Sequence, residues 1–153
     1  LKFGEQKRVF SMIPGLENAE FVRYGVMHQN TFLQSPKLLD KYYADRRNPL
    51  VAFAGQMTGV EGYVESTASG YLAAVAMAAK VQGRELPDFP KETAIGALGR
   101  YVSDESIENF QPMNINFSII APLEKRIRKK AEKNLAIAAR SLDVIDRLVA
   151  KGI

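Results

Sequence analysis

Three glycines spaced over eight residues are the part of this sequence best suited to chemistry. Gly55, Gly59 and Gly62 follow a short apolar run at residues 50–54 and precede a stretch with helical periodicity. Such a loop lets backbone N–H groups approach a ligand closely, and the N-terminus of the following helix adds about half a positive charge. The pattern predicts a strand, a loop and a helix that together bind a ligand. A tight turn without a ligand explains the spacing equally well.

The spacing differs from the dinucleotide-binding fingerprint. That fingerprint, G-x-G-x-x-G, follows a strand and has an acidic residue about twenty positions later. Here the spacing is G-x-x-x-G-x-x-G, and the fingerprint occurs nowhere in the 153 residues. If a flavin or nicotinamide nucleotide binds, this chain therefore supplies only part of its site.

The elements around the loop indicate an α/β fold. Apolar and alternating runs predict short strands at residues 21–27, 38–44 and 50–54. Helices are expected at residues 2–13, after the glycine loop as far as Gly83, and at residues 93–102, where Gly96 and Gly99 weaken the helix. The inward face of the helix after the loop is expected to hold Val64, Ala68, Tyr71, Leu72, Val75 and Ala79.

The helix after the loop is rich in small residues and has Gly70 near its middle. Glycine in a helix interior costs about 1 kcal/mol relative to alanine. We therefore expect another backbone to approach closely at Gly70, from the sheet or from a part of the protein outside this chain. Tolerated weakness of the helix is the alternative.

The net charge of +4 is concentrated between Pro122 and Lys133, which hold six basic and two acidic residues. Pro122 suits the first position of a helix, and a long amphipathic helix is predicted from there to about Lys151. Its inward face is expected to hold Leu123, Ile127, Ala131, Leu135, Ala138, Leu142, Ile145 and Val149. The spacing then places Lys125, Arg128 and Lys129 on one exposed face, which suits a polyanion or simply a solvated surface.

The composition excludes several classes of protein. Hydrophobic residues make up 46% and charged residues 25%, which is ordinary for a globular domain. Without cysteine the chain has no disulfide, no thiolate metal site and no cysteine nucleophile, and no metal site is expected. No apolar run approaches the length of a membrane span, and no signal peptide is visible. A cytoplasmic location is expected, and the first residue, Leu1, suggests a fragment.

Several stretches resemble one known family. The sequence FAGQMTGVEGYVESTASG at residues 53–70 is similar to the C-terminal flavin-contacting segment of the folate- and FAD-dependent tRNA uracil-5-methyltransferases. Segments at residues 4–10, 13–28, 30–32 and 110–114 resemble the same family in the same order. The match runs through nearly the whole chain and corresponds to the last third of such an enzyme.

The resemblance implies a partial FAD-binding domain of the Rossmann-like class. It places His28 against the folate, where a flat imidazole can stack on a pterin, although a surface or hydrogen-bonded histidine is the alternative. Gln29 stands where arginine is expected, so a charge and a bidentate donor are missing if that position contacts an anion. FAD contacts are implied for Gly55, Gln56, Thr58, Gly59, Gly62, Tyr63 and Glu65.

The resemblance also implies an activity for the complete enzyme. FAD takes a one-carbon unit from methylenetetrahydrofolate and passes it to C5 of a uridine in the tRNA T-loop, with NADPH or NADH as reductant. The family needs a cysteine nucleophile, so no catalytic residue is expected in this chain, which should be inactive alone. The expected partners are tRNA, contacted by Lys125, Arg128 and Lys129, and the missing N-terminal part of the enzyme.

The expected organisation has three parts. Residues 1–83 belong to the FAD- and folate-binding domain, residues 84–121 form a linker with a short helix, and residues 122–153 form a basic helix packed on the same domain. Two other functions fit the sequence. One is the related FAD-dependent enzyme that modifies the tRNA wobble uridine, which shares the G-Q-x-x-G-x-x-G-Y skeleton. The other is a non-catalytic α/β module that binds RNA or a protein partner.

Overall fold

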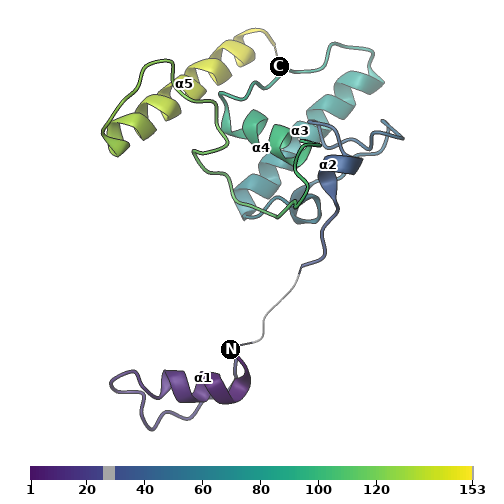
Figure 1. Cartoon of the computed structure of the whole chain (residues 1–153). Helices are drawn as coiled ribbons and strands as arrows, with labels where there is room; N and C mark the ends of the chain where they lie inside the picture. Colours follow the sequence, from purple (N-terminus) through teal and green to yellow (C-terminus); the bar gives the residue numbers. More distant parts are fainter. Residues whose placement is uncertain (26–29, 153) are drawn as a thin grey trace. The chain divides into compact units, whose positions relative to one another are not determined.

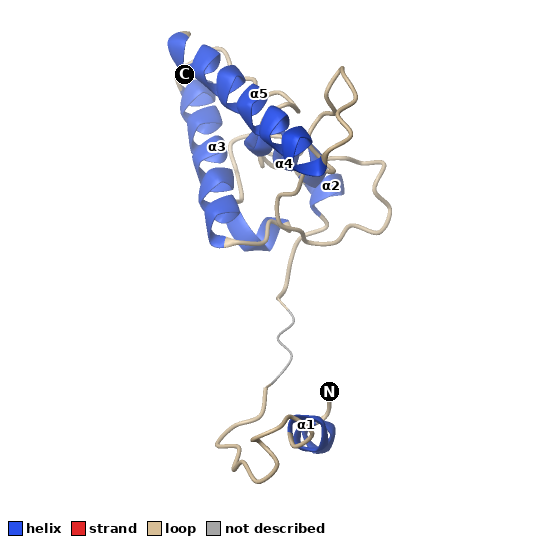
Figure 2. Cartoon of the chain, turned by 90° about the vertical axis from the view of Figure 1, so that its left-hand side faces the viewer, coloured by secondary structure: helices blue, strands red, loops and turns tan. Residues whose placement is uncertain are grey.

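The computed structural model describes residues 1–25 and 30–152, in two compact units, Leu1–Asn30 and Thr31–Ile153 (Figure 1). The predictions for His28 and Gln29 lie outside the described residues. None of the described residues belongs to a strand, and Figure 2 draws helices and loops only. In the same residues, no helix is long and apolar enough to cross a membrane. The helices are α1 (Phe3–Phe10), α2 (Ser35–Leu38), the 3₁₀ helix η1 (Gly55–Thr58), α3 (Tyr63–Val81), α4 (Ala94–Val102) and α5 (Lys130–Ala150).

In the first unit, α1 confirms the central part of the helix predicted at residues 2–13, and it packs against an irregular segment at residues 21–25. The side chain of Gln6 is buried and forms two hydrogen bonds with the backbone of Gly25, at 2.8 and 3.0 Å. The ring of Tyr24 lies 5.8 Å from that of Phe3. The strand predicted at residues 21–27 is wrong over its described part, because this segment pairs with the side chains of a helix and not with a neighbouring strand.

In the second unit, the strands predicted at residues 38–44 and 50–54 are also wrong. The first segment folds back on itself through a single antiparallel bridge between Leu39 and Asp45, and a second single bridge between Ala44 and Ala52 joins it to the other segment. Regular pairing stops because Tyr43 has a φ of 64°, in the left-handed region that strands do not adopt. Residue 38 belongs instead to α2, which has a proline in its first turn. The described residues therefore do not confirm the α/β prediction.

The helix predicted after the glycine loop is confirmed as α3, and so is its end at Gly83. Gly83 has a φ of 65° and donates its N–H to the carbonyl oxygen of Lys80 at 3.2 Å, while Arg84 donates to that of Ala79 at 2.8 Å. These two bonds form a Schellman motif, which satisfies the last carbonyl groups of the helix.

The buried face of α3 differs from the predicted one. Leu72 and Ala79 are buried as predicted, but Val64 is 80% and Tyr71 is 52% exposed. Small residues occupy the rest of the buried face, because α4 packs so closely that the side chain of Leu72 lies next to the backbone of Gly99. The buried residues are Ser69, Leu72, Ala73, Ala76 and Ala79.

The helix predicted at residues 93–102 is confirmed as α4, and its two glycines have a structural role. Thr93 caps the helix by accepting a hydrogen bond from the N–H of Gly96 at 3.1 Å. A Cβ atom at Gly96 would lie 2.2 Å from the carbonyl oxygen of Phe89, and one at Gly99 would lie 2.5 Å from that of Lys41. Both glycines therefore allow the helix to lie directly against neighbouring backbone.

The long C-terminal helix begins at Lys130, so the prediction that it starts at Pro122 is wrong. A helix extended back to residue 122 would place Lys125, Arg126 and Arg128 at its positively polarised N-terminus, where cations are unfavourable. It would also bring Lys125 within one turn of Lys129, a like-charge pair that destabilises a helix. Residues 122–129 form an irregular segment instead.

The inward face of α5 also differs from the prediction. Ile137 is 1% exposed and packs with Ala97 and Ile120, whereas Leu135 and Leu142 are 71% and 65% exposed. The helix packs through Ile137, so its inward face is rotated from the one predicted. The prediction that Ile145 faces the core is confirmed.

Candidate functional site

The glycine loop is a 3₁₀ turn followed by α3, and its conformation requires its glycines. Gly55, Gly59 and Gly62 have φ values of 72°, 84° and 97°, all in the left-handed region that strains other residues. The loop is tied to α3, because the N–H of Gly55 donates to Oγ of Ser69 at 2.8 Å. The predicted loop before a helix is thus present, although no regular strand leads into it.

Two predicted FAD contacts lie on the inner side of this loop. Thr58 is fully buried, and its hydroxyl donates to the carbonyl oxygen of Gly55 at 2.7 Å. Gly59 is buried against Phe110, so that a Cβ atom on Gly59 would lie 2.4 Å from the ring. Both residues shape the loop, and neither presents a side chain to a ligand.

The outer side of the loop exposes the polar groups that a ligand would meet. Gln56 is exposed, and Tyr63, the first residue of α3, is 96% exposed. The N–H groups of Tyr63, Val64 and Glu65 have no hydrogen-bond acceptor among the described residues, and α3 has no side-chain cap. The carboxylate of Glu65 folds over Gly62, within 2.2 Å of where a Cβ atom would be.

These groups define the chemistry that the loop can bind. A bare helix N-terminus attracts negative charge and offers N–H donors. The carboxylate of Glu65 opposes an anion at the same place and adds an acceptor. The outer side therefore suits a neutral polar edge that carries both carbonyl oxygens and an N–H group better than it suits a phosphate.

Sequence reasoning missed the segment that supports the loop. Val60 and Met113 form a parallel bridge, in which Glu61 donates to Met113 at 3.0 Å and Met113 donates to Gly59 at 3.1 Å. Residues 110–114 resemble the same family as the loop, which was the available signal, but spacing alone does not indicate a contact across fifty residues.

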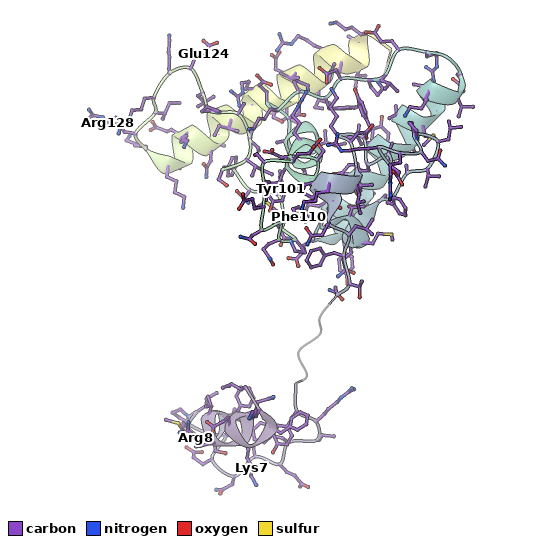
Figure 3. All side chains as sticks on the ribbon, turned by 45° about the vertical axis from the view of Figure 1, so that its right-hand side comes forward. Lys7, Arg8, Tyr101, Phe110, Glu124 and Arg128 are labelled. Carbon is purple, nitrogen blue, oxygen red and sulfur yellow. The ribbon has the colours of Figure 1, made fainter. Side chains whose placement is uncertain are left out.

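The side chain of Phe110 stabilises the segment that supports the glycine loop. It is 1% exposed, and its ring centre lies 5.6 Å from that of Tyr101 on α4. Figure 3 shows the two rings beside each other in the body of the unit. The hydroxyl of Tyr101 donates to the carbonyl oxygen of Gln111 at 2.8 Å, so α4 fixes the segment that in turn fixes the glycine loop.

The three residues predicted to contact tRNA do not share a helix face, so that part of the prediction is wrong. Lys125 and Arg128 lie in the irregular segment before α5, where Figure 3 shows Arg128 at the outer edge of the loop. Lys129 forms a salt bridge with Glu132 at 3.0 Å. Lys125 lines a cavity of about 480 Å³ that also holds Glu124. Arg128, by contrast, lies in a hollow with other basic residues and, among the described residues, without a carboxylate.

That environment is a groove of about 570 Å³, here called the basic groove. Two of its basic residues, Arg128 and Lys130, flank the start of α5. The sequence indicated the cations of the groove only through the concentration of charge between Pro122 and Lys133. The groove is lined by Phe117, Ser118, Arg126, Ile127, Arg128, Lys130, Lys133 and Asn134.

Comparison with known proteins shows that the chain belongs to a known family. The family model described as glucose inhibited division protein A matches residues 1–85, more than half of the chain.

Among the described residues, no group of three or more His, Cys, Asp or Glu side chains is placed to hold a metal ion.

Curated relatives match almost the whole chain. A methylenetetrahydrofolate–tRNA-(uracil-5-)-methyltransferase of Acetivibrio thermocellus is 56% identical over 151 residues, which cover 99% of this chain and 35% of the relative. The proteins of the same name from Streptococcus agalactiae and Bacillus cereus are 57% and 56% identical over 150 and 149 residues, and 34% of each is covered. The resemblance seen in the sequence is confirmed, and this chain spans about a third of the length of these relatives.

Proposed function

Since the chain belongs to the glucose inhibited division protein A family, we propose that it forms the flavin- and folate-contacting segment of a flavoprotein that methylates tRNA. The complete enzyme makes 5-methyluridine in the T-loop, with methylenetetrahydrofolate as carbon donor and a reduced nicotinamide cofactor. The observation that carries this proposal is the 56% identity to methyltransferases over 99% of the chain. The segment alone is inactive, because it has no cysteine to attack the uracil ring.

The outer side of the glycine loop contacts FAD, which supplies the redox and one-carbon transfer chemistry when bound. When FAD is bound, the N–H groups of Tyr63 and Val64 would hold it as hydrogen-bond donors, and the carboxylate of Glu65 would hold it as an acceptor. The ring of Tyr63 is free to pack against the cofactor. Gly55, Thr58, Gly59 and Gly62 set the backbone that presents these groups.

The finer parts of the proposal concern the whole protein. The backbone around two single bridges, Leu39–Asp45 and Ala44–Ala52, supports the proposal that this segment joins a Rossmann-like sheet formed with the rest of the enzyme. His28 stacks on the folate, and the protein acts in the cytoplasm. Lys125, Arg128 and Lys129, which are all exposed, contact the tRNA backbone individually.

Two matched tyrosines test the flavin contact. Tyr63 and Tyr71 are both exposed on α3 and differ in their distance along the helix from the glycine loop. In the complete enzyme, Tyr63→Ala should weaken FAD binding about fivefold, the effect of removing one aromatic ring that packs on a ligand, and Tyr71→Ala should leave it unchanged. The apoenzyme of each variant is dialysed against FAD, and the flavin absorbance per protein then measures how much FAD each variant binds. Equal FAD binding by the two variants would remove Tyr63 from the site.

The reaction is tested on an unmodified tRNA transcript. The complete enzyme, given methylenetetrahydrofolate and reduced nicotinamide, should form 5-methyluridine in the T-loop. Modification of the wobble uridine in its place would assign the chain to the related enzyme. In the same assay, His28→Ala should raise the folate concentration needed for half-maximal rate and leave FAD bound, whereas loss of both would indicate a structural histidine.

A further inference from the structure

We propose that the basic groove is a subsite for one unpaired nucleotide of an RNA, with Phe117 stacked on the base and the surrounding cations on the flanking phosphates. RNA as the ligand rests on the proposed function, whereas the nucleotide chemistry follows from the groove itself. The proposal replaces a general basic face with a site of defined shape and composition.

The charges of the groove are free to bind an anion. Arg126, Arg128, Lys130 and Lys133 are all exposed, and none of the four makes a salt bridge within the described part of the chain. No carboxylate lines the groove there. By contrast, the neighbouring cavity, which Lys125 lines, also contains Glu92 and Glu124. Excess positive charge is therefore concentrated in one of two adjacent hollows.

Phe117 gives the groove a second kind of contact. Phe117 is 45% exposed, although a phenyl ring usually avoids water, and it lines the groove beside the cations. Exposed aromatic rings next to basic side chains are the usual elements of single-strand binding, because every base can stack on a ring while its phosphates meet cations. The volume of about 570 Å³ lies within the range of small-ligand sites, roughly 300–1,000 Å³.

The walls of the groove are held in place by local contacts. The side-chain oxygen of Asn116 accepts hydrogen bonds from both the N–H and the hydroxyl of Ser118, which fixes the turn that carries Phe117. Outside the groove, Arg140 of α5 donates to the carbonyl oxygens of Ala121 and Pro122, and so anchors the start of the basic segment. A site fixed before binding loses less entropy when its ligand binds.

The stacking of the ring is tested with Phe117→Leu in the complete enzyme. The probes are a fluorescently labelled single-stranded RNA of twelve nucleotides and the same RNA annealed to its complement. The variant should bind the single strand about fivefold more weakly or worse, and should bind the duplex as the wild type does, because paired bases cannot stack on the ring. Tyr71→Leu, an exposed aromatic residue outside the groove, is the control and should bind both RNAs normally.

The role of the charges is tested by changing all four cations of the groove to glutamine. The slope of log affinity against log salt should fall by about 0.7 for each phosphate of the single strand that the groove no longer neutralises. The matched control carries the same charge loss at exposed lysines outside the groove, Lys2, Lys7, Lys37 and Lys151, and should keep the wild-type slope. Circular dichroism checks that each variant is folded.

Two outcomes would overturn the proposal. If Phe117→Leu binds the single strand normally, the groove holds no base. If the control lysine variant loses as much of the salt dependence as the groove variant, the effect is one of net charge. Failure of the methyltransferase proposal is seen separately, as absence of 5-methyluridine from an enzyme whose binding of single-stranded RNA still depends on the groove.

Discussion

The helices α3 and α4 pack against each other and both contain glycine in their interior, yet these glycines have different surroundings. At Gly96 and Gly99 of α4, a Cβ atom would fall on backbone carbonyl oxygens at 2.2 and 2.5 Å. At Gly70 of α3, the nearest atom is Cβ of Ala54, at 4.0 Å. In these two helices, the glycines in close contact are therefore those that face a neighbouring backbone.

The largest effect is expected from Gly96→Ala and Gly99→Ala. Each added methyl group meets a carbonyl that cannot rotate away, so α4 must shift from its neighbours. We expect each substitution to lower the free energy of unfolding of this chain by about 3 kcal/mol, the upper part of the range for overpacking. Urea unfolding followed by circular dichroism measures the change. A loss below about 0.5 kcal/mol, the range of exposed sites, would show that α4 is not held this closely.

Gly59→Ala should have the next largest effect, with Gly55→Ala as its control. Both residues have a positive φ, so alanine at either position costs about 1–2 kcal/mol. At Gly59 the methyl group would also overlap with the ring of Phe110. At Gly55 it would lie 3.6 Å from Cβ of Ser66, an ordinary van der Waals distance. The free energy of unfolding should therefore fall more for Gly59→Ala, by about 1 kcal/mol or more. Equal losses would mean that the ring of Phe110 moves aside without cost.

The sequence predicted the positions of α3 and α4 well because helical signals are local. The helical spacing after the glycine loop and the glycine at the end of α3 act within a few residues. The same spacing did not identify the buried face of α3. The strands were predicted wrongly because pairing depends on distant partners. Nothing local at residues 38–44 indicates that Tyr43 has a positive φ, and the supporting bridge joins Val60 to Met113, far along the chain.

The candidate site was predicted in part for the same reason. The glycines of the loop were identified, because positive φ values favour one residue type. Which loop residues face outward was not predictable, since Thr58 and Gly59 are buried by Ser35 and Phe110 from other segments. In the basic segment the charge count was correct, but the helix assumed for it was wrong. The apolar spacing that predicted a helix from Pro122 takes no account of repulsion between the cations in that segment.

Gly70→Ala should increase the stability of the chain, which distinguishes the glycine of α3 from the two glycines of α4. The methyl group meets only Ala54, at van der Waals distance, and alanine is the better helix former by about 1 kcal/mol. The free energy of unfolding of this chain should rise by up to that amount. The expectation of close backbone approach at Gly70 is wrong within the described residues. If Gly70→Ala also lowers the FAD content of the complete enzyme, another part of that enzyme approaches there.

The smallest expected effect on stability comes from a charged contact of α4, for which α3 has no equivalent at Lys80. Arg100 of α4 contacts Asp88 at 3.2 Å, and Lys41 contacts the same carboxylate at 2.6 Å. The hydrogen bond from Lys41, with the charges of Lys41 and Arg100, lowers the pKa of Asp88 below its ordinary 3.8. On α3, Lys80 instead donates to the carbonyl oxygen of Pro49, which does not titrate.

Asp88→Asn should therefore destabilise the chain in a pH-dependent manner. A lowered pKa means that the ionised carboxylate stabilises the folded state above pH 3.8, and that this contribution is lost as the pH falls through the folded pKa. The difference in free energy of unfolding between wild type and variant should be on the order of 0.5 kcal/mol at pH 7, as for exposed ion pairs, and should disappear in acid. Lys80→Met should show the same difference at both pH values. A constant difference for Asp88→Asn would mean that α4 depends on its glycine contacts and not on this charge.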